Sequence, residues 1–367
     1  MKEIRNIISA YETVDWSTEK AALATVVSVE ESAYRRIGAR MFVKNSGDWI
    51  GGISGGCLEG DALKRAQIAI LKDTPSIVVY DTMDDDAHQI GVGLGCNGRI
   101  EVLFVPVDPN DSHNPVEQLK TIVKKREPTI LYQLINTKHN DQLGYLNENL
   151  ESFSNDLNFD SSEILSLKAI VIEKKKSKVF SVKNQAGENC DLLIEFIRPE
   201  LKLILVGDNY DVNAFVGIAD ELGWDIHVIG LLRKIGKHIY EKSSQVLSYE
   251  QAADIQLDEY TAIVLMSHDY DKDMRMVIQF MSQQPPYMGM LGPKKRMIKM
   301  QNDLQKTDAE VNLDALHFFY SPVGLDIGAE SPEEIALSIT AEIITVFRKR
   351  SGSHLKFREG TIHERDL

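Results

Sequence analysis

The second half of the sequence alternates short apolar runs with amphipathic stretches, and this alternation constrains the fold more than any other feature. Four runs are typical of buried strands: LKLILVG, WDIHVIG, TAIVLMSHD and YMGMLG. Helical patterns lie between and after them, ending with SPEEIALSITAEIITVFRKR. Strands that alternate with helices predict a parallel sheet covered on both faces. We therefore expect residues 201–350 to form a doubly wound α/β domain.

The first half mixes helices and strands without regular alternation, which predicts an α+β domain over residues 1–107. Apolar runs indicate strands at 21–30, 76–81 and 99–107, and the stretch ARMFVKNSGDWIGG is typical of a hairpin. A helical pattern covers residues 2–13, and the apolar spacing in CLEGDALKRAQIAILKD predicts a second helix.

The middle of the chain carries weaker patterns. We expect residues 108–200 to be an extension of the first domain and a linker, beginning at the polar stretch DPNDSHNP. Strands are expected at 129–135 and 191–197, and the polar segment 137–162 is expected to be rich in loops. Residues 351–367 are expected to form a tail.

The charge balance restricts the classes of molecule that the protein can bind. The chain has 41 Lys and Arg against 55 Asp and Glu, a net charge of −14, which argues against binding to a nucleic-acid backbone. No apolar stretch approaches the roughly 18 residues of a membrane span, and the first residues lack the pattern of a signal peptide. Three cysteines make no disulfide framework. We expect a cytoplasmic protein that binds neither nucleic acid nor membrane.

A cysteine enclosed by glycines is the most unusual local feature of the first half. The stretch GGISGGCLEGD, residues 51–61, places five glycines around Cys57. If a helix begins near Leu58, then Gly55, Gly56 and Cys57 lie at its N-terminus, where free N–H groups attract anions and favour a thiolate. The alternative is a tight turn around a buried, inert cysteine. This stretch alone does not decide between them.

A second stretch, GVGLGCNG at residues 91–98, repeats this composition. Gly93 and Gly95 precede Cys96, so two of the three cysteines lie in glycine loops. This favours a soft ligand, a reactive thiol pair or a thiol that contacts a cofactor. Zinc is disfavoured because the Cys-x-x-Cys spacing is missing. Cys190 is interpreted as ordinary packing.

Three arginines, Arg35, Arg36 and Arg40, lie in SAYRRIGARM. Guanidinium groups form bidentate contacts with phosphate or carboxylate, so these residues are candidates for binding an anionic ligand. The alternative is a solvated turn.

The second half lacks most of a dinucleotide-binding fingerprint. In LILVGDNYDVNAF only Gly207 of the three small residues remains, because Asn209 and Val212 fill the other positions. Gly230 stands where an acidic residue is expected after the second strand. The sequence therefore favours a structural role for this loop over NAD(P) binding.

Several other residues are expected at the carboxyl edge of the same sheet, where such sheets bind ligands. His268 and Asp269 follow the strand AIVLM, Gly292 precedes a helix that opens with basic residues, and Asp326 lies in the loop SPVGLDIGAE. A metal site and a phosphate site are both possible there, and neither pattern is specific.

Taken together, these segments resemble the XdhC/CoxI family, accessory proteins of xanthine dehydrogenase-type molybdenum enzymes. The resemblance is carried by RRIGARM, GGISGGCLEGD, GLGCNGRIEVLF, SHDYDKD, YMGMLGPKKR and PVGLDIGAESPEEIALSITAEII. It implies an N-terminal XdhC/CoxI domain and a C-terminal Rossmann-like domain. Family members bind the molybdenum cofactor, hold it while a cysteine desulfurase replaces an oxygen with sulfur, and pass it to a partner enzyme. The sequence departs from the family at Asn209-Tyr210, Gly230 and Tyr320.

The resemblance implies a non-enzymatic molybdenum-cofactor chaperone, active as a homodimer, whose partners are a molybdenum hydroxylase and a cysteine desulfurase. Cys57 would face the molybdenum. The other residues expected at the cofactor are Gly55, Gly56, Glu59, Gly93, Gly95, Cys96, Arg35, Arg36, Arg40, Gly207, His268, Asp269, Gly292 and Asp326. An NAD(P)-dependent oxidoreductase is the alternative. A metal-dependent hydrolase that uses His268, Asp269 and Asp326 is the third and weakest hypothesis.

Overall fold

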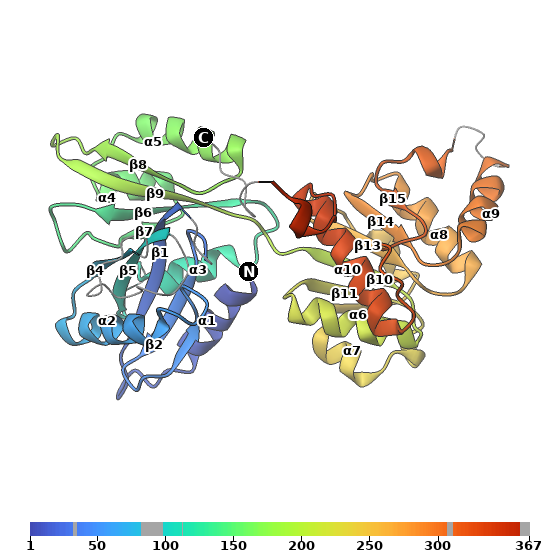
Figure 1. Cartoon of the computed structure of the whole chain (residues 1–367), viewed down its shortest axis with the longest axis horizontal. Coiled ribbons are helices and arrows are strands. Elements are labelled where there is room, and N and C mark those ends of the chain that lie inside the picture. The colour runs from blue at the N-terminus through green and yellow to red at the C-terminus, as the bar shows by residue number, and fades with distance from the viewer. Residues whose placement is uncertain (32–34, 82–97, 112, 307–310, 360–367) are drawn as a thin grey trace. The chain divides into compact units, whose positions relative to one another are not determined.

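A computed structural model describes residues 1–31, 35–81, 98–111, 113–306 and 311–359. The chain divides into two compact units, Met1–Pro199 and Glu200–Leu367 (Figure 1). In the described residues, no helix combines the length and the apolar character needed to cross a membrane.

The C-terminal unit is built on a six-stranded parallel sheet in the order β12-β11-β10-β13-β14-β15. The strands are β10 (Lys202–Val206), β11 (Asp225–Ile229), β12 (Gln245–Leu247), β13 (Thr261–Leu265), β14 (Tyr287–Met290) and β15 (Phe319–Tyr320). The strand order reverses between β10 and β13, so a crevice is expected beyond their carboxyl ends. The doubly wound sheet predicted from the alternating pattern is confirmed.

Helices cover both faces of this sheet. They are α6 (Tyr210–Glu221), α7 (Lys237–Lys242), α8 (Tyr270–Met281), α9 (Lys294–Gln305) and α10 (Pro332–Arg348). The buried residues of β10 alternate between two hydrophobic cores. On one face, Leu203 packs with α10 and with Phe215 of α6; on the other face, Ile204 packs with α9 and with Phe280 of α8. Burial on both faces explains why the strands are continuously apolar.

The N-terminal unit begins with a five-stranded antiparallel sheet in the order β3-β2-β1-β5-β4. Its strands are β1 (Ala21–Glu31), β2 (Arg40–Lys44), β3 (Trp49–Gly51), β4 (Ser76–Asp81) and β5 (Gly98–Val107). Helix α2 (Glu59–Lys72) packs small residues such as Ala62 against one face, and α1 (Lys2–Glu12) packs Ile7 against the other. The predicted hairpin and both predicted helices are confirmed.

A second sheet follows in the order β7-β6-β9-β8, which comprises β6 (Thr129–Asn136), β7 (Leu146–Asn147), β8 (Lys178–Lys183) and β9 (Asn189–Ile197). Its helices are α3 (Pro115–Ile122), α4 (Leu150–Asp156) and α5 (Ser161–Lys174). The segment 137–162 is rich in turns and loops, as expected, at 137–145, 148–149 and 157–160, but it also contains β7, α4 and the start of α5, which the sequence patterns do not predict. The side chains of Asn149 and Asp160 cap α4 and α5 by accepting from the amides of Ser152 and Ser162.

The two sheets of this unit share a core and a buried ion pair. Val27 and Leu103 of the first sheet pack with Ile135 and Leu193 of the second. Arg40 of β2 forms a bidentate contact with Glu195 of β9, at 3.1 Å for Nη1 and 2.5 Å for Nη2. Burial of both side chains makes this pair a fixed connection between the sheets.

Candidate functional site

Cys57 lies in the loop between β3 and α2, and its side chain is exposed. Helix α2 begins at Glu59 with Leu58 at the N-cap position, as the sequence predicts. Gly55 and Gly56 adopt φ values of 123° and 115°, which favour glycine over residues with a side chain. The cysteine is therefore presented by the loop and is not buried in it.

The carboxylate of Glu59 organises this loop. It accepts hydrogen bonds from four successive amides, those of residues 53–56, at 2.8–3.2 Å, and from the hydroxyl of Ser54. The amides of Gly55 and Gly56 were expected to be free for an anionic ligand. They are instead occupied by a carboxylate of the same chain, because Glu59 folds back into the concavity that they form.

The hydrogen bonds from the loop lower the pKa of Glu59 and so stabilise its charged form. Burial alone would raise the pKa, but hydrogen bonds from the Ser54 hydroxyl and from the amides of Ser54 and Gly55 outweigh it and lower the pKa to about 2. The ordinary value is 4.5. Glu59 therefore stabilises the fold above its ordinary pKa, and this contribution is lost as the pH falls from about 4.5 to about 2.

Replacing Glu59 with Gln is expected to lower the free energy of unfolding by about 2–3 kcal/mol at pH 7. The carboxamide of Gln would place an N–H donor against the backbone amides of residues 53–56, which are themselves donors and need an acceptor. The difference from wild type should shrink as the pH approaches 2, because the protonated carboxyl of the wild type then has the same defect. Urea unfolding at several pH values measures this, with the exposed Glu173→Gln as control. A difference that does not depend on pH would contradict the assignment.

Of the three arginines, only two are accessible. Arg35 is 43% exposed, forms an ion pair with Glu3 at 3.2 Å, and lies beside the cysteine loop, where a Cβ at Gly52 would be 3.6 Å from its Nη2 atom. Arg36 is also exposed. Arg40 differs from the expectation that it binds the cofactor, because its guanidinium is buried against Glu195 and has no face open to a ligand.

The other two cysteines have separate outcomes. Cys190 is buried on β9, and burial raises the pKa of its thiol, which agrees with a packing role. Cys96 lies outside the described residues together with Gly93 and Gly95. Whether the second glycine loop approaches Cys57 therefore stays a prediction.

In the C-terminal unit, the loop after β10 is occupied by its own side chains. Asp208 accepts a hydrogen bond from the amide of Leu231 at 3.0 Å, and its carboxylate lies 3.4 Å from Nζ of Lys234. Asn209 caps α6 by accepting from the amide of Asp211, and its side-chain amide donates to the carbonyl of Met266. A carboxylate and a side-chain cap thus stand where a dinucleotide phosphate would need free amides.

Gly207 has a packing reason to be glycine, because a Cβ there would lie 2.8 Å from the carbonyl oxygen of Met266. Gly207→Ala is therefore expected to destabilise the C-terminal unit by about 1–3 kcal/mol. The matched control is Gly217→Ala on α6, where a Cβ would meet no atom within 4 Å and the helix should gain about 0.5–1 kcal/mol. Urea unfolding measures both, and equal effects would contradict the packing explanation.

Of the remaining residues expected at this edge, His268 and Asp269 make local contacts. His268 has a φ of 58° and lies 3.0 Å from Oδ2 of Asp211, while Asp269 caps α8 and contacts Lys272. Gly292, with a φ of 130°, lies before α9, and Asp326 is exposed in the loop before α10. In the described residues, no three His, Cys, Asp or Glu side chains form a group that could hold a metal.

One buried ion pair at this edge was not predicted. Asp273 of α8 accepts hydrogen bonds from the hydroxyl of Ser267 at 2.5 Å and from Nη2 of Arg296 at 2.6 Å. Burial raises the pKa of Asp273, although both partners oppose that rise. In the sequence, Asp273 resembles an ordinary acidic residue in a first helical turn, and only the fold brings Arg296 of α9 to it.

Comparison with known proteins identifies the family. Residues 17–81 match the profile of the XdhC and CoxI family, and residues 203–343 match that of the XdhC Rossmann domain. A Bacillus subtilis (strain 168) protein named as a probable xanthine dehydrogenase subunit is 30% identical over 338 residues, which cover 90% of this chain and 94% of that protein. The chain belongs to the XdhC and CoxI family.

Two further relatives of this XdhC and CoxI chain are informative. The molybdenum cofactor insertion chaperone PaoD of Escherichia coli (strain K12) is 21% identical over 334 residues, covering 90% of this chain and 84% of PaoD. A crystal structure described as a xanthine dehydrogenase from Bacillus halodurans superimposes with a TM-score of 0.69 at 24% identity, covering 94% of this chain and 96% of that one. This likeness supports the fold.

Proposed function

We propose that this chain binds and protects the molybdenum cofactor, supports its sulfuration and delivers it to a xanthine dehydrogenase-type or carbon monoxide dehydrogenase-type molybdenum hydroxylase. The observation that carries the proposal is the exposed Cys57 thiol on a loop braced by Glu59. The similarity to a chain named as a molybdenum cofactor insertion chaperone, over 90% of this sequence, supports it.

The residues in and beside the Cys57 loop suit the metal and the anionic part of the cofactor. A thiolate is a soft donor, so Cys57 would contact the molybdenum, which supplies redox chemistry in the client enzyme. Arg35 and Arg36 would attract the anionic part, since guanidinium groups bind phosphate well. Glu59 would act by fixing the loop, because its carboxylate is already saturated by amides. Arg40 is excluded from this set by its burial.

The partners are also proposals. A molybdenum hydroxylase would receive the cofactor, and a cysteine desulfurase would supply the sulfur, in the cytoplasm. A homodimer follows from the family resemblance, and light scattering that gives the mass of a single chain would contradict it.

We do not propose a nicotinamide-dependent oxidoreductase as a second function. Asn209 accepts from the amide of Asp211 at the start of α6, Asp208 accepts from the amide of Leu231 after β11, and the carboxylate of Asp208 disfavours a pyrophosphate there. Calorimetric titration with NADH that revealed micromolar binding would reverse this judgement.

The proposed function is tested by incubating the full chain, without oxygen, with cofactor released from a denatured molybdoenzyme and then separating free cofactor by gel filtration. Molybdenum and pterin are expected to elute with the protein in similar amounts. An unrelated acidic protein treated in the same way is the control for non-specific retention. Elution of the chain without molybdenum or pterin would contradict the proposal.

A further inference from the structure

Large apolar side chains lie exposed on the face of the N-terminal unit that presents Cys57. Leu71, near the end of α2, is 86% exposed, the highest value among the exposed large apolar side chains that the structure describes. Ile68 of the same helix is 44% exposed, and Trp49 of the edge strand β3 is 47% exposed. Single exposed apolar residues are ordinary on a protein surface, so their significance depends on whether they lie together.

Helix α2 places its exposed residues in one stripe. Gly60, Lys64, Ile68 and Leu71 recur at the spacing of one helix face, and all four are exposed. The opposite face packs on the sheet through small residues such as Ala66. From Gly60 to Leu71 the helix rises about 16 Å. The stripe and the thiol at its start therefore fit within one interface of standard size, about 800 Å² on each partner.

Trp49 lies on the same side of the first sheet as α2. It pairs with Val43, whose side chain belongs to the core beneath α2, and the side chains of directly paired residues point to one face of a sheet. The turn before β3 also reaches the helix, because a Cβ at Gly47 would lie 4.0 Å from Nε2 of Gln67. Trp49 therefore lies beside α2, and Trp is enriched among the residues that dominate binding energy in protein interfaces.

Gly60 leaves the first turn of α2 without a side chain, three residues after Cys57. Glycine inside a helix is less favourable than alanine by about 1 kcal/mol. Packing within the described chain does not require glycine here, because a Cβ at Gly60 would meet no atom within 4 Å. Glycine does allow another molecule to approach the backbone closely. The surface next to the thiol is thus open to a large partner.

The charges of α2 complement an acidic partner. Its two carboxylates are used within the chain, because Glu59 binds the loop amides and Asp61 accepts from the hydroxyl of Tyr80 at 3.0 Å. Lys64 and Lys72 are exposed, and neither forms an ion pair with a residue that the structure describes. The outer side of α2 is therefore basic on a chain whose net charge is −14. Such a face attracts an acidic surface of a different protein.

We propose that the docking face, which comprises Trp49, Cys57, Lys64, Ile68 and Leu71, binds the molybdenum hydroxylase that receives the cofactor. A cofactor held at Cys57 can enter another protein only if that protein covers the thiol, so the contact surface has to continue from it. Trp49 and Leu71 would enter apolar recesses of the enzyme, and Lys64 would face carboxylates beside them. The identity of this partner rests on the proposed function, whereas the location of the face rests on exposure, spacing and charge.

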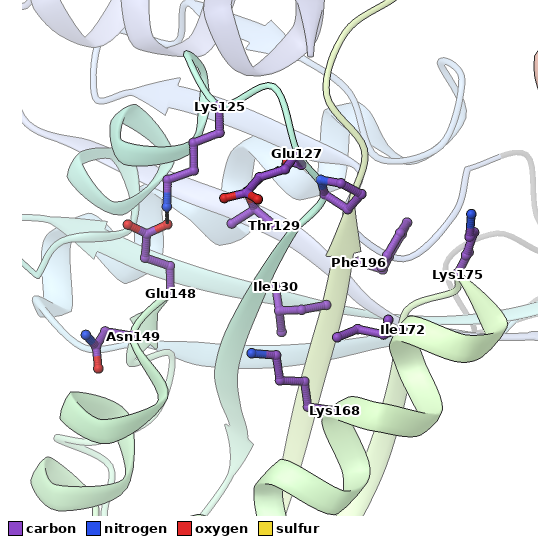
Figure 2. Close-up of a pocket in the computed structure, with 11 residues that line it drawn as sticks. Lys125, Glu127, Thr129, Ile130, Glu148, Asn149, Lys168, Ile172, Lys175 and Phe196 are labelled. Atoms are coloured by element: carbon purple, nitrogen blue, oxygen red, sulfur yellow. Dashed lines mark hydrogen bonds and ion pairs between the residues drawn. The ribbon is translucent and has the colours of Figure 1, made fainter. Parts of the chain in front are cut away.

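A second exposed apolar surface of the N-terminal unit provides the control. A pocket of about 540 Å³ lies on the second sheet, with walls from β6, β9, α5 and the residues around the start of α4 (Figure 2). Ile172 of α5 lines this pocket and is 46% exposed, and Leu165 of the same helix is 55% exposed. Helix α5 packs on the second sheet and α2 packs on the first (Figure 1). An enzyme docked over Cys57 is therefore not expected to reach Leu165.

The test is the affinity of the full chain for the molybdenum hydroxylase encoded in the same genome, purified without its cofactor and immobilised for biolayer interferometry. Leu71→Glu and Trp49→Ala are each expected to weaken binding about tenfold or more, because a charge or a void replaces a buried apolar anchor. Lys64→Glu should slow association, most strongly at low salt. Leu165→Glu is the matched control and should bind as wild type does.

No cofactor takes part in this measurement, so its outcome is separate from that of molybdenum retention, which all four variants should keep. If wild type retains no molybdenum yet binds the enzyme through the docking face, the proposed function fails and the docking face stands. Unchanged thermal unfolding verifies that each variant is folded. Equal affinity of wild type, Leu71→Glu and Trp49→Ala would overturn the proposal, and so would an equal loss for Leu165→Glu. Absence of binding by wild type below about 100 μM would overturn it as well.

Discussion

Replacing Glu195 with Ala is expected to destabilise the N-terminal unit by about 3–5 kcal/mol, because it leaves the guanidinium of Arg40 buried without a counter-charge. Arg40 and Glu195 have side-chain exposures of 2% and 7%, so water cannot replace the lost carboxylate. One hydrogen bond, from Nη1 to the carbonyl of Gly38, would remain. In the part of the chain that the structure describes, Nε of Arg40 has no hydrogen-bond partner even in the intact protein.

Urea unfolding followed by tryptophan fluorescence measures this loss, since Trp16 and Trp49 report on the N-terminal unit and Trp224 on the C-terminal unit. The control is Glu19→Ala, which removes the partner of Lys44 from a more exposed pair and should cost about 1 kcal/mol or less. The double substitution Arg40→Met with Glu195→Leu should recover most of the stability. A loss for Glu195→Ala as small as that for Glu19→Ala would contradict the structural role of this pair.

The C-terminal fold could be predicted because its information is local. The four central strands β10, β11, β13 and β14 are buried on both faces and therefore appear as continuous apolar runs. The long helices have periodic apolar faces, whereas the short edge strands β12 and β15 are only partly buried and give no such run. The capping box at Ser331 and Glu334 even locates the first turn of α10 in the sequence, and the structure has both of its hydrogen bonds.

The role of Arg40 could not be predicted, because its partner lies 155 residues further along the chain. A sequence shows that a residue is an arginine but not which carboxylate the fold brings to it. The same limit applies to Asp273 and Arg296, and to the pocket on the second sheet, whose walls come from four separate elements.

The organisation of the Cys57 loop could be predicted only in part from the sequence. The glycines and the start of the helix were evident, and the acidic residue at the first helical position was a usable signal for an internal anion. Glycine-rich loops before helices also often bind an external anion, so the sequence alone does not distinguish an internal carboxylate from a ligand. The structure reassigns the amides to Glu59 and leaves the thiol as the exposed group.

Replacing Cys57 with Ala is expected to reduce molybdenum retention at least about tenfold, as loss of a donor near a metal does. The thiol is exposed and the loop is held by Glu59, so the substitution should leave the fold and the stability unchanged. Any loss of retention would then reflect a lost contact with the cofactor. Cys190→Ala is the matched control, because it removes the buried thiol and leaves Cys57 in place.

The most direct test of the central claim is the molybdenum content per chain of wild type, Cys57→Ala and Cys190→Ala after anoxic loading and gel filtration, with thermal unfolding recorded for each. We predict that wild type and Cys190→Ala retain molybdenum equally and that Cys57→Ala, although as stable as wild type, loses most of it. Equal retention by a folded Cys57→Ala and by wild type would contradict the claim that the Cys57 loop holds the metal end of the cofactor.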